Sequence, residues 1–175
     1  MSTSIFILPG LYNSGPQHWQ SHWEIKYGFT RINQDNWETP VCSEWIERIN
    51  TTITGIPDDE IVLIGHSLAC CTIINWAKTY QRKIKGALMV GPSDTEAPNY
   101  PPGTKGFTPM PLYKLSFPSI VIASTDDEYV SEERANFFAS HWGSELEFVG
   151  ALGHINSASN LGDWDQGYRI LSRLL

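Results

Sequence analysis

Ile61-Val62-Leu63-Ile64-Gly65-His66-Ser67-Leu68-Ala69-Cys70 joins a run of apolar residues to a serine that is flanked by small residues. Four consecutive apolar residues are typical of a strand buried on both faces. Small residues two positions before and two after a serine let a strand and a helix pack closely, while the sharp turn between them holds the hydroxyl clear of the backbone. The stretch therefore predicts a nucleophile elbow with Ser67 as the nucleophile, although Ala69 stands where the usual pattern has a second glycine.

Two other structures also place a serine after a strand. A serine caps the N-terminus of many helices, and dinucleotide-binding folds turn on a glycine at this point. The residues after Gly65 lack the further glycines that let a backbone approach a pyrophosphate. We therefore expect neither a dinucleotide nor any other cofactor.

Outward from this stretch, apolar runs alternate between strand-like and helix-like periods. Strands are expected at 5–8, near 29–32, and at 61–64, 84–90, 119–123 and 145–149; helices are expected at 17–27, near 45–53, after Ser67, at 131–142 and near 164–175. This alternation, together with the elbow, predicts an α/β-hydrolase fold: a mostly parallel sheet with helices on both faces and no large cap domain. A chain of 175 residues has room for one such domain, over 1–175.

Residues 93–116 break this rhythm. The segment is rich in proline and shows no sustained period. Loops of this length inside a compact domain are usually functional covers or disordered insertions. Because it follows a sheet strand, we expect a partly mobile loop that forms a wall of the pocket.

Composition narrows the class of partner. The net charge is −7, and the lysines and arginines are scattered, so nucleic acid is not an expected partner. No apolar stretch approaches the roughly 20 residues of a membrane span. No positive charge precedes the short apolar run at the start of the chain, so a secretory leader is not expected either. A small-molecule substrate is the expected partner.

The cysteines indicate a reducing compartment. There are three, so they cannot all pair, and Cys70 and Cys71 are neighbours at the start of an expected helix. A disulfide framework is therefore not expected, and a cytoplasmic protein fits best.

A serine nucleophile requires a base, and the base requires a carboxylate that fixes its tautomer. In α/β hydrolases the chain order is nucleophile, acid, histidine, with the last two on loops after later strands. Asp126, Asp127 and His154 occupy such positions. We favour Ser67, Asp127 and His154, because Asp127-Glu128-Tyr129-Val130 resembles the turn common after this strand in such hydrolases. Asp126 is the alternative acid.

Acyl transfer also needs hydrogen-bond donors for the developing oxyanion. The backbone N–H after the nucleophile, on Leu68, is one of them by construction. The second is expected from the turn after the first strand, where Pro9 has no N–H to offer. Leu11 is the preferred residue, and Tyr12 is the second choice.

Several short motifs carry a resemblance that extends over nearly the whole chain. They are Pro9-Gly10, His18-Trp19, Gly65-His66-Ser67, Ser124-Thr125-Asp126-Asp127, Gly153-His154 and Gly162-Asp163-Trp164. In these the chain resembles the small serine hydrolases similar to retinoblastoma-binding protein 9 and the bacterial YdeN-like proteins. The resemblance implies a serine hydrolase whose triad falls on Ser67, Asp127 and His154.

One property of the animal protein is not carried over by this resemblance. Its name rests on a pocket-protein motif, L-x-C-x-E, and the nearest string here is Pro40-Val41-Cys42-Ser43-Glu44. The leucine is absent, so the interaction is not expected.

Three other functions compete with a serine hydrolase. His18 and His22 have the spacing of two zinc ligands on a helix, but the general-base glutamate and a third ligand are missing, so no metal is expected. A cysteine nucleophile at Cys70 would lie inside the helix. A non-catalytic binding module that keeps the hydrolase fold is the main alternative.

Aromatic residues near the expected active-site loops indicate the substrate class. These residues are Tyr12, Trp19, Tyr100, Phe107 and Tyr129. They predict an apolar, confined cavity rather than an open polypeptide groove. We therefore expect a small carboxylic ester with a short acyl chain to be the preferred substrate.

Overall fold

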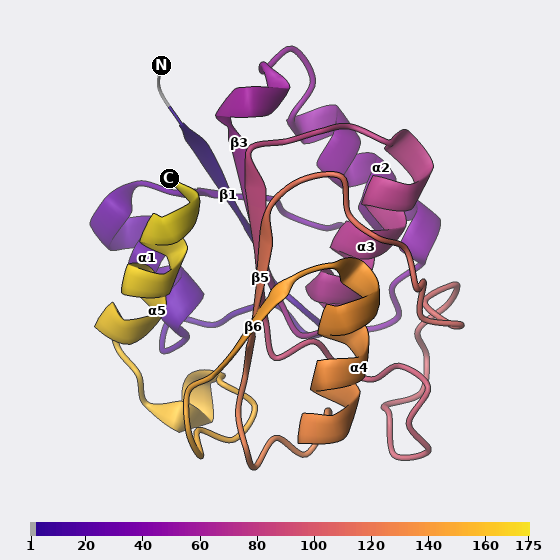
Figure 1. Ribbon diagram of the computed structural model, residues 1–175, viewed down its shortest axis with the longest axis vertical. Helices are drawn as coiled ribbons and strands as arrows, with labels where there is room; N and C mark the ends of the chain where they lie inside the picture. The colour runs from indigo at the N-terminus through magenta and orange to yellow at the C-terminus, as the bar shows by residue number, and fades with distance from the viewer. Residues whose placement is uncertain (1–2) are drawn as a thin grey trace.

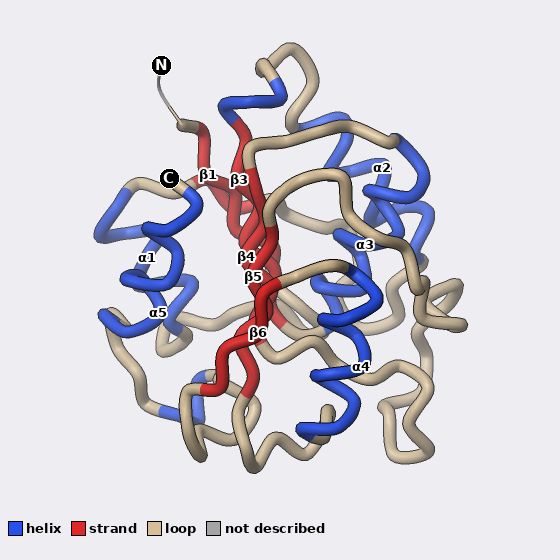
Figure 2. The backbone as a smooth tube through the Cα atoms, in the orientation of Figure 1, coloured by secondary structure: helices blue, strands red, loops and turns tan. Residues whose placement is uncertain are grey.

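A sheet of six parallel strands runs through the computed structural model, which describes residues 3–175 (Figure 2). The strands are β1 (Ser4–Leu8), β2 (Thr30–Arg31), β3 (Ile61–His66), β4 (Gly86–Val90), β5 (Ser119–Ala123) and β6 (Glu145–Phe148). Their order is β2-β1-β3-β4-β5-β6, and every pairing is parallel. Met1 and Ser2, at the start of the segment considered for a leader, lie outside the described residues.

Helices cover both faces of this sheet, which confirms the predicted layering. They are α1 (Trp19–Tyr27), α2 (Cys42–Thr52), α3 (Leu68–Tyr80), α4 (Glu132–Trp142) and α5 (Asp165–Leu171), with short 3-10 turns η1 (Asp58–Glu60), η2 (Ser157–Ser159) and η3 (Ser172–Leu174). Figure 1 shows α1 and α5 on one side of the sheet and α2, α3 and α4 on the other. Within residues 3–175, no inserted helical unit caps the sheet.

The two faces have separate hydrophobic cores. The larger core, under α2, α3 and α4, is mostly aliphatic. All of β3 is buried, and its side chains contribute to both cores. The smaller core, under α1 and α5, centres on Trp19, Trp23 and Trp164. The Trp19 ring centroid lies 4.7 Å from that of Trp23 and 5.0 Å from that of Trp164. Segments from opposite ends of the chain thus build the second core together.

Local signals fix the ends of α4, the helix expected at 131–142. The Ser131 hydroxyl accepts a hydrogen bond from the Arg134 N–H at the N-terminus. Gly143 ends the helix in the left-handed conformation, with φ of 70°. The strand expected from residue 84 begins two residues later, at Gly86, and Ile84 is buried in the core.

The connection from β1 places the site. The chain leaves β1 through α1 to β2 on one side, and returns through α2 to β3 on the other side of β1. Neighbouring parallel strands whose connections diverge in this way leave a crevice outside their carboxyl ends, where ligands bind in open α/β sheets. The turn after β1 and the turn after β3 therefore meet at this crevice.

Residues 93–116 form neither helix nor strand, as predicted from their sequence. The loop is nevertheless packed: Phe107, Met110 and Leu115 are buried in the larger core. Its start is held by an ion pair between Asp94 and Arg134 of α4.

The remaining features concern cysteines and membranes. Cys42, Cys70 and Cys71 are free and buried. Among the helices that the structure describes, none combines the length and apolar character needed to cross a membrane.

Candidate active site

Ser67 lies in the strained turn between β3 and α3. Its backbone has φ of 58° and ψ of −124°, a region that side-chain-bearing residues seldom adopt. A Cβ on Gly65 would lie 2.7 Å from the Ile73 side chain and 3.2 Å from the Ala69 backbone, so only glycine lets β3 and α3 approach this closely. Close packing of β3 against α3 therefore requires glycine at position 65, whereas alanine is accommodated at position 69.

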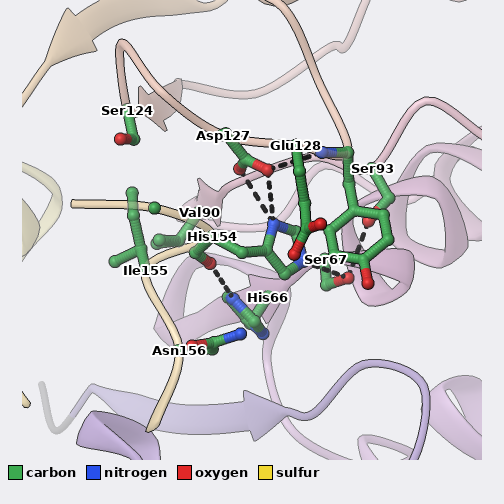
Figure 3. A network of polar contacts seen from close by, with 12 residues as sticks. His66, Ser67, Val90, Ser93, Ser124, Asp127, Glu128, His154, Ile155 and Asn156 are labelled. Carbon is green, nitrogen blue, oxygen red and sulfur yellow. Dashed lines mark hydrogen bonds and ion pairs between the residues drawn. The ribbon is translucent and has the colours of Figure 1, made fainter. Parts of the chain in front are cut away.

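Ser67, His154 and Asp127 form one hydrogen-bond chain (Figure 3). The Ser67 Oγ lies 2.8 Å from His154 Nε2, and His154 Nδ1 lies 2.9 and 2.8 Å from the two carboxylate oxygens of Asp127. The Asp127 side chain has no exposed surface, and Asp127 Oδ1 also accepts the Tyr129 N–H at 2.8 Å. The structure therefore brings together the three residues that the chain order singled out.

This network assigns the protons on the imidazole. An ionised carboxylate only accepts hydrogen bonds, so the proton of neutral His154 is on Nδ1. His154 Nε2 is then an acceptor, and Ser67 donates to it. That is the arrangement in which a histidine removes a proton from a serine.

Asp126 is engaged elsewhere. Its Oδ1 accepts hydrogen bonds from the Ser124 hydroxyl and the Gly153 N–H, both at 2.7 Å. These two bonds, the Ser124 hydroxyl first, lower the pKa of the Asp126 carboxyl below its ordinary value. Asp126 therefore ties the end of β5 to the loop that carries His154, and does not contact the imidazole.

The turn after β1 packs directly against the elbow. A Cβ on Gly10 would lie 2.7 Å from the His66 carbonyl oxygen, 2.8 Å from Ser67 Cβ and 3.3 Å from the Leu68 nitrogen. The Tyr12 N–H donates to the Trp37 carbonyl at 2.9 Å, so it is not available to an oxyanion. Leu11 lines the cavity beside Ser67. Tyr12 is thereby excluded as the second oxyanion donor, and Leu11 stays the predicted donor.

Distant side chains hold the loop that carries His154. His66 Nε2 donates to the His154 carbonyl at 2.9 Å, and Trp19 Nε1 donates to the Ile155 carbonyl at 2.8 Å. The Ser124 hydroxyl accepts the Leu152 N–H at 2.8 Å. Burial lowers the pKa of His66 well below its ordinary value, so this imidazole is a neutral donor.

Ser93 is a residue of the site that sequence reasoning missed. Its Oγ lies 2.7 Å from the Ser67 Oγ, and the residue is 1% exposed. Ser93 follows the Gly91-Pro92 turn that ends β4, a position next to the elbow strand in the sheet. The one available signal was this place in the topology, because an isolated serine in a proline-rich loop has no motif.

A cavity of about 380 Å³ opens onto Ser67 and His154. Tyr12, Tyr100 and Tyr129 line it, as expected, and none of its described lining residues is lysine or arginine. Two other aromatic residues were predicted wrongly as walls: Trp19 and Phe107 are each 1% exposed and belong to the hydrophobic cores. Trp19 packs against Trp23 and Trp164 in the smaller core, and Phe107 packs in the larger core beneath the long loop.

The residues proposed for a metal or a cysteine nucleophile lie in other environments. His18 Nδ1 accepts the Gln20 N–H, while His22 contacts Asp163. Over residues 3–175, no group of three potential ligand side chains is arranged around a common point. Burial raises the pKa of the Cys70 thiol, which disfavours the thiolate needed for attack.

Known structures share this architecture. A protein from Pectobacterium atrosepticum described as a YdeN-like hydrolase is 29% identical, with a TM-score of 0.86 over 99% of this chain and 90% of its own. The ydeN gene product of B. subtilis is 19% identical, with a TM-score of 0.84 over 99% of this chain and 98% of its own. A thermophilic esterase from Thermogutta terrifontis is 13% identical, with a TM-score of 0.72 over 99% and 91%.

These likenesses identify the fold as that of the α/β hydrolases, as predicted. No protein of curated function shows a significant sequence match to the chain. The model of the serine hydrolase family matches residues 5–173, which include the elbow and both loops that meet it. This chain therefore belongs to the serine hydrolase family and shares the architecture of its small YdeN-like members.

Proposed function

We propose that the protein hydrolyses small, uncharged carboxylic esters through a covalent acyl-enzyme on Ser67. The observation that carries this proposal is the unbroken hydrogen-bond chain from Asp127 through His154 to Ser67. Nucleophile, base and orienting acid are each within hydrogen-bond distance of their partner, which is the geometric requirement for activating a serine.

In the first half-reaction, His154 Nε2 removes the Ser67 proton as Oγ attacks the ester carbonyl carbon. The carbonyl π electrons move to oxygen, and the N–H groups of Leu68 and Leu11 stabilise the resulting oxyanion. Asp127 stabilises the imidazolium without itself becoming protonated. Collapse of the oxyanion breaks the bond to the alcohol oxygen, which takes the proton from His154.

In the second half-reaction, water replaces the alcohol. His154 takes a proton from water as the hydroxide oxygen attacks the acyl carbon. A second oxyanion forms and collapses, the bond from the acyl carbon to the Ser67 Oγ breaks, and Oγ recovers its proton from His154. The products are a carboxylic acid and the restored enzyme.

The cavity supports a small, neutral substrate. A volume of about 380 Å³ lies at the low end of the range for drug-sized ligands. Burial raises the pKa of the Tyr100 hydroxyl, so this wall is an uncharged phenol. The chain carries a net charge of −7, and no cationic side chain among the described lining residues compensates an anionic acyl group. We therefore expect short, uncharged acyl groups to react fastest.

A fluorophosphonate probe tests the chemistry. The protein should label, and Ser67→Ala should abolish labelling while the thermal unfolding midpoint is retained. Continued labelling of that variant would place the nucleophile elsewhere. A wild-type protein that does not label would instead favour the alternative function, a non-catalytic binding module.

A series of p-nitrophenyl esters from acetate to palmitate tests the substrate class. We expect kcat/KM to be highest for the short acyl chains and to fall as the chain outgrows the cavity. A rate that rises steadily to palmitate, or peptide-bond cleavage with inert esters, contradicts the proposal. The hemisuccinate ester, which adds one carboxylate, should react more slowly than the neutral butyrate ester of equal acyl length.

A further inference from the structure

Two serine hydroxyls from different strands meet at the centre of the site. Ser67 comes from the turn after β3, and Ser93 follows β4, the next strand in the sheet. Their Oγ atoms are 2.7 Å apart, and Figure 3 shows both side chains pointing toward the same space. Ser93 Oγ has no other hydrogen-bond partner among the described residues. Its hydroxyl is therefore directed at the nucleophile alone.

Counting protons fixes the direction of this hydrogen bond. A serine hydroxyl has one hydrogen to donate and two lone pairs to accept with. In the proton arrangement derived above, Ser67 gives its hydrogen to His154 Nε2, 2.8 Å away. Ser67 has no second hydrogen, so the bond of 2.7 Å requires Ser93 as the donor.

We propose that Ser93 is a further catalytic residue, whose hydroxyl stabilises the negative charge that develops on Ser67 Oγ. The inference rests on the proposed function of Ser67. In the first half-reaction the charge develops as His154 removes the proton, and in the second as Oγ leaves the acyl carbon. A hydrogen bond to a charged acceptor is roughly twice as strong as one to a neutral acceptor. Ser93 therefore stabilises both transition states more than the resting enzyme.

Ser93 keeps its own proton throughout. No bond to Ser93 forms or breaks, and His154 remains the only group that takes up and returns the transferred proton. The proton balance of the two half-reactions is therefore the one already given, and no co-reactant is required.

Topology separates Ser93 from the oxyanion donors. Leu11 follows β1 and Ser93 follows β4, and β3 lies between these two strands. The two donors thus approach Ser67 from opposite sides, so Ser93 can bind Oγ while Leu11 and Leu68 bind the substrate oxygen. One set of donors serves the substrate, and the other serves the nucleophile.

The neighbour of Ser93 fixes the loop in place. The Asp94 N–H donates to the Tyr129 carbonyl at 2.9 Å, two residues beyond Asp127. Both carboxylate oxygens of Asp94 accept hydrogen bonds from the Arg134 guanidinium, at 2.6 and 3.1 Å. Such a two-point ion pair has a defined geometry. Ser93 is therefore held relative to the same segment that carries the triad acid.

Separate rates for the two half-reactions test this role. A stopped-flow burst with p-nitrophenyl acetate gives the acylation rate and the deacylation rate of one protein. Ser93→Ala should slow both by about tenfold, the loss expected when a charge-assisted hydrogen bond is removed. Ser93→Cys, which is close in size but a weak donor, should be slowed in both steps as well.

Ser119→Ala is the matched control. Ser119 begins β5, and its Oγ lies 2.7 Å from the Ser144 Oγ, so this substitution also breaks a serine pair, partly buried and away from the nucleophile. We expect wild-type rates in both steps for this variant. Equal slowing in Ser119→Ala and Ser93→Ala would reduce the effect to a loss of packing and overturn the proposal.

The remaining outcomes separate this inference from the proposed function. If Ser93→Ala and Ser93→Cys acylate and deacylate at wild-type rates, Ser93 has no catalytic role, although Ser67 remains the nucleophile. Slowing of only one half-reaction also contradicts the proposal, because the charge on Oγ develops in both. If the wild-type protein gives no burst and no labelling, the proposed function itself fails.

Discussion

Ser67 and His154 meet 2.8 Å apart, but the molecule holds them in different ways. The turn that carries Ser67 is set by its own strand and helix, with Gly65 allowing the close approach of β3 and α3. The loop that carries His154 connects β6 to the last helix, and side chains from distant parts of the chain hold it. Trp19 and His66 donate to its carbonyls, 136 and 88 residues away in sequence.

The difference shows which half of the site is vulnerable. A nucleophile fixed by backbone geometry withstands changes elsewhere in the protein. A base fixed by single hydrogen bonds from remote side chains depends on each of them. Substitutions far from Ser67 should therefore reduce activity mainly by displacing His154.

Removing the carboxylate that orients His154 should have the largest effect. In Asp127→Asn the amide oxygen keeps the hydrogen bond from the Tyr129 N–H, which turns the NH₂ group toward His154 Nδ1. The NH₂ group cannot accept the Nδ1 proton, so the tautomer able to accept the Ser67 proton is lost. We expect kcat to fall by about 10⁴ with little change in KM. Ester hydrolysis and the thermal unfolding midpoint, measured together, check this prediction. A variant that keeps more than a tenth of the activity would remove Asp127 from the triad.

Acid should lower the free energy of unfolding, because buried histidines lie beside the two regions. His18 packs edge-on against His66, with ring centroids 4.6 Å apart. Burial, followed by the nearby Arg31 charge, lowers the pKa of His18 from 6.5 to about 3, and burial likewise lowers the pKa of His66. Below pH 6.5 the unfolded chain takes up protons that the folded protein excludes, so stability is full above pH 6.5 and declines toward pH 3.

The size of this decline is set by proton uptake. Each excluded proton contributes a slope of about 1.4 kcal/mol per pH unit to the unfolding free energy. His18→Asn keeps an N-cap acceptor for α1 but has no titrating ring. Between pH 6 and 5, its unfolding free energy should therefore fall less steeply than that of the wild type, by about 1.4 kcal/mol per pH unit. Urea unfolding at several pH values measures both slopes. Identical slopes for the two proteins would show that His18 is protonated in the folded state.

A single remote donor should have a smaller, kinetic effect. Trp19→Phe keeps an aromatic ring in the second core but removes the hydrogen bond to the Ile155 carbonyl, next to His154. We expect kcat to fall by about tenfold. Trp23→Phe is the matched control, because Trp23 Nε1 donates to the Asp163 carbonyl instead. Its turnover should stay near the wild-type value, and equal losses in both variants would mean that packing, not the bond, positions His154.

The smallest effect should follow from Asp126→Asn. The Asn side-chain oxygen can still accept the Ser124 hydroxyl and the Gly153 N–H, so both ties to the histidine loop persist. We expect activity to change by less than about threefold. A loss as great as that of Asp127→Asn would assign the orienting role to Asp126. Comparing the two variants therefore shows which of the neighbouring aspartates orients His154.

Sequence reasoning succeeded where the signal was local. The elbow around Ser67 lies within ten residues whose pattern specifies a strand, a turn and a helix. The parallel sheet followed from runs such as 119–123, which forms β5 over the same residues. The helix expected at 131–142 forms α4, between the caps Ser131 and Gly143. In each case the residues that determine the element lie within the element or directly beside it in the sequence.

It failed where contacts join distant segments. Ser93 and Ser67 are 26 residues apart, and no periodicity links them. Trp19 was expected near the cavity, but it packs against Trp23 and against Trp164, which lies 145 residues further along the chain. Phe107 lies in an irregular loop, where no period reports which side chains are buried. Such positions depend on the folded chain as a whole.

The core shared by α1 and α5 has a consequence for synthesis. A ribosome delivers Trp19 and Trp23 early, but Trp164 and Tyr168, which pack against them, emerge near the end. Until then the helix that holds Ile155 lacks its cover, and the histidine loop lacks its anchor. A nascent chain halted just after β6 and η2 should contain a finished elbow yet resist acylation by a fluorophosphonate. In a pulse-labelled translation reaction, labelling by the fluorophosphonate would then begin only when the last helix is complete.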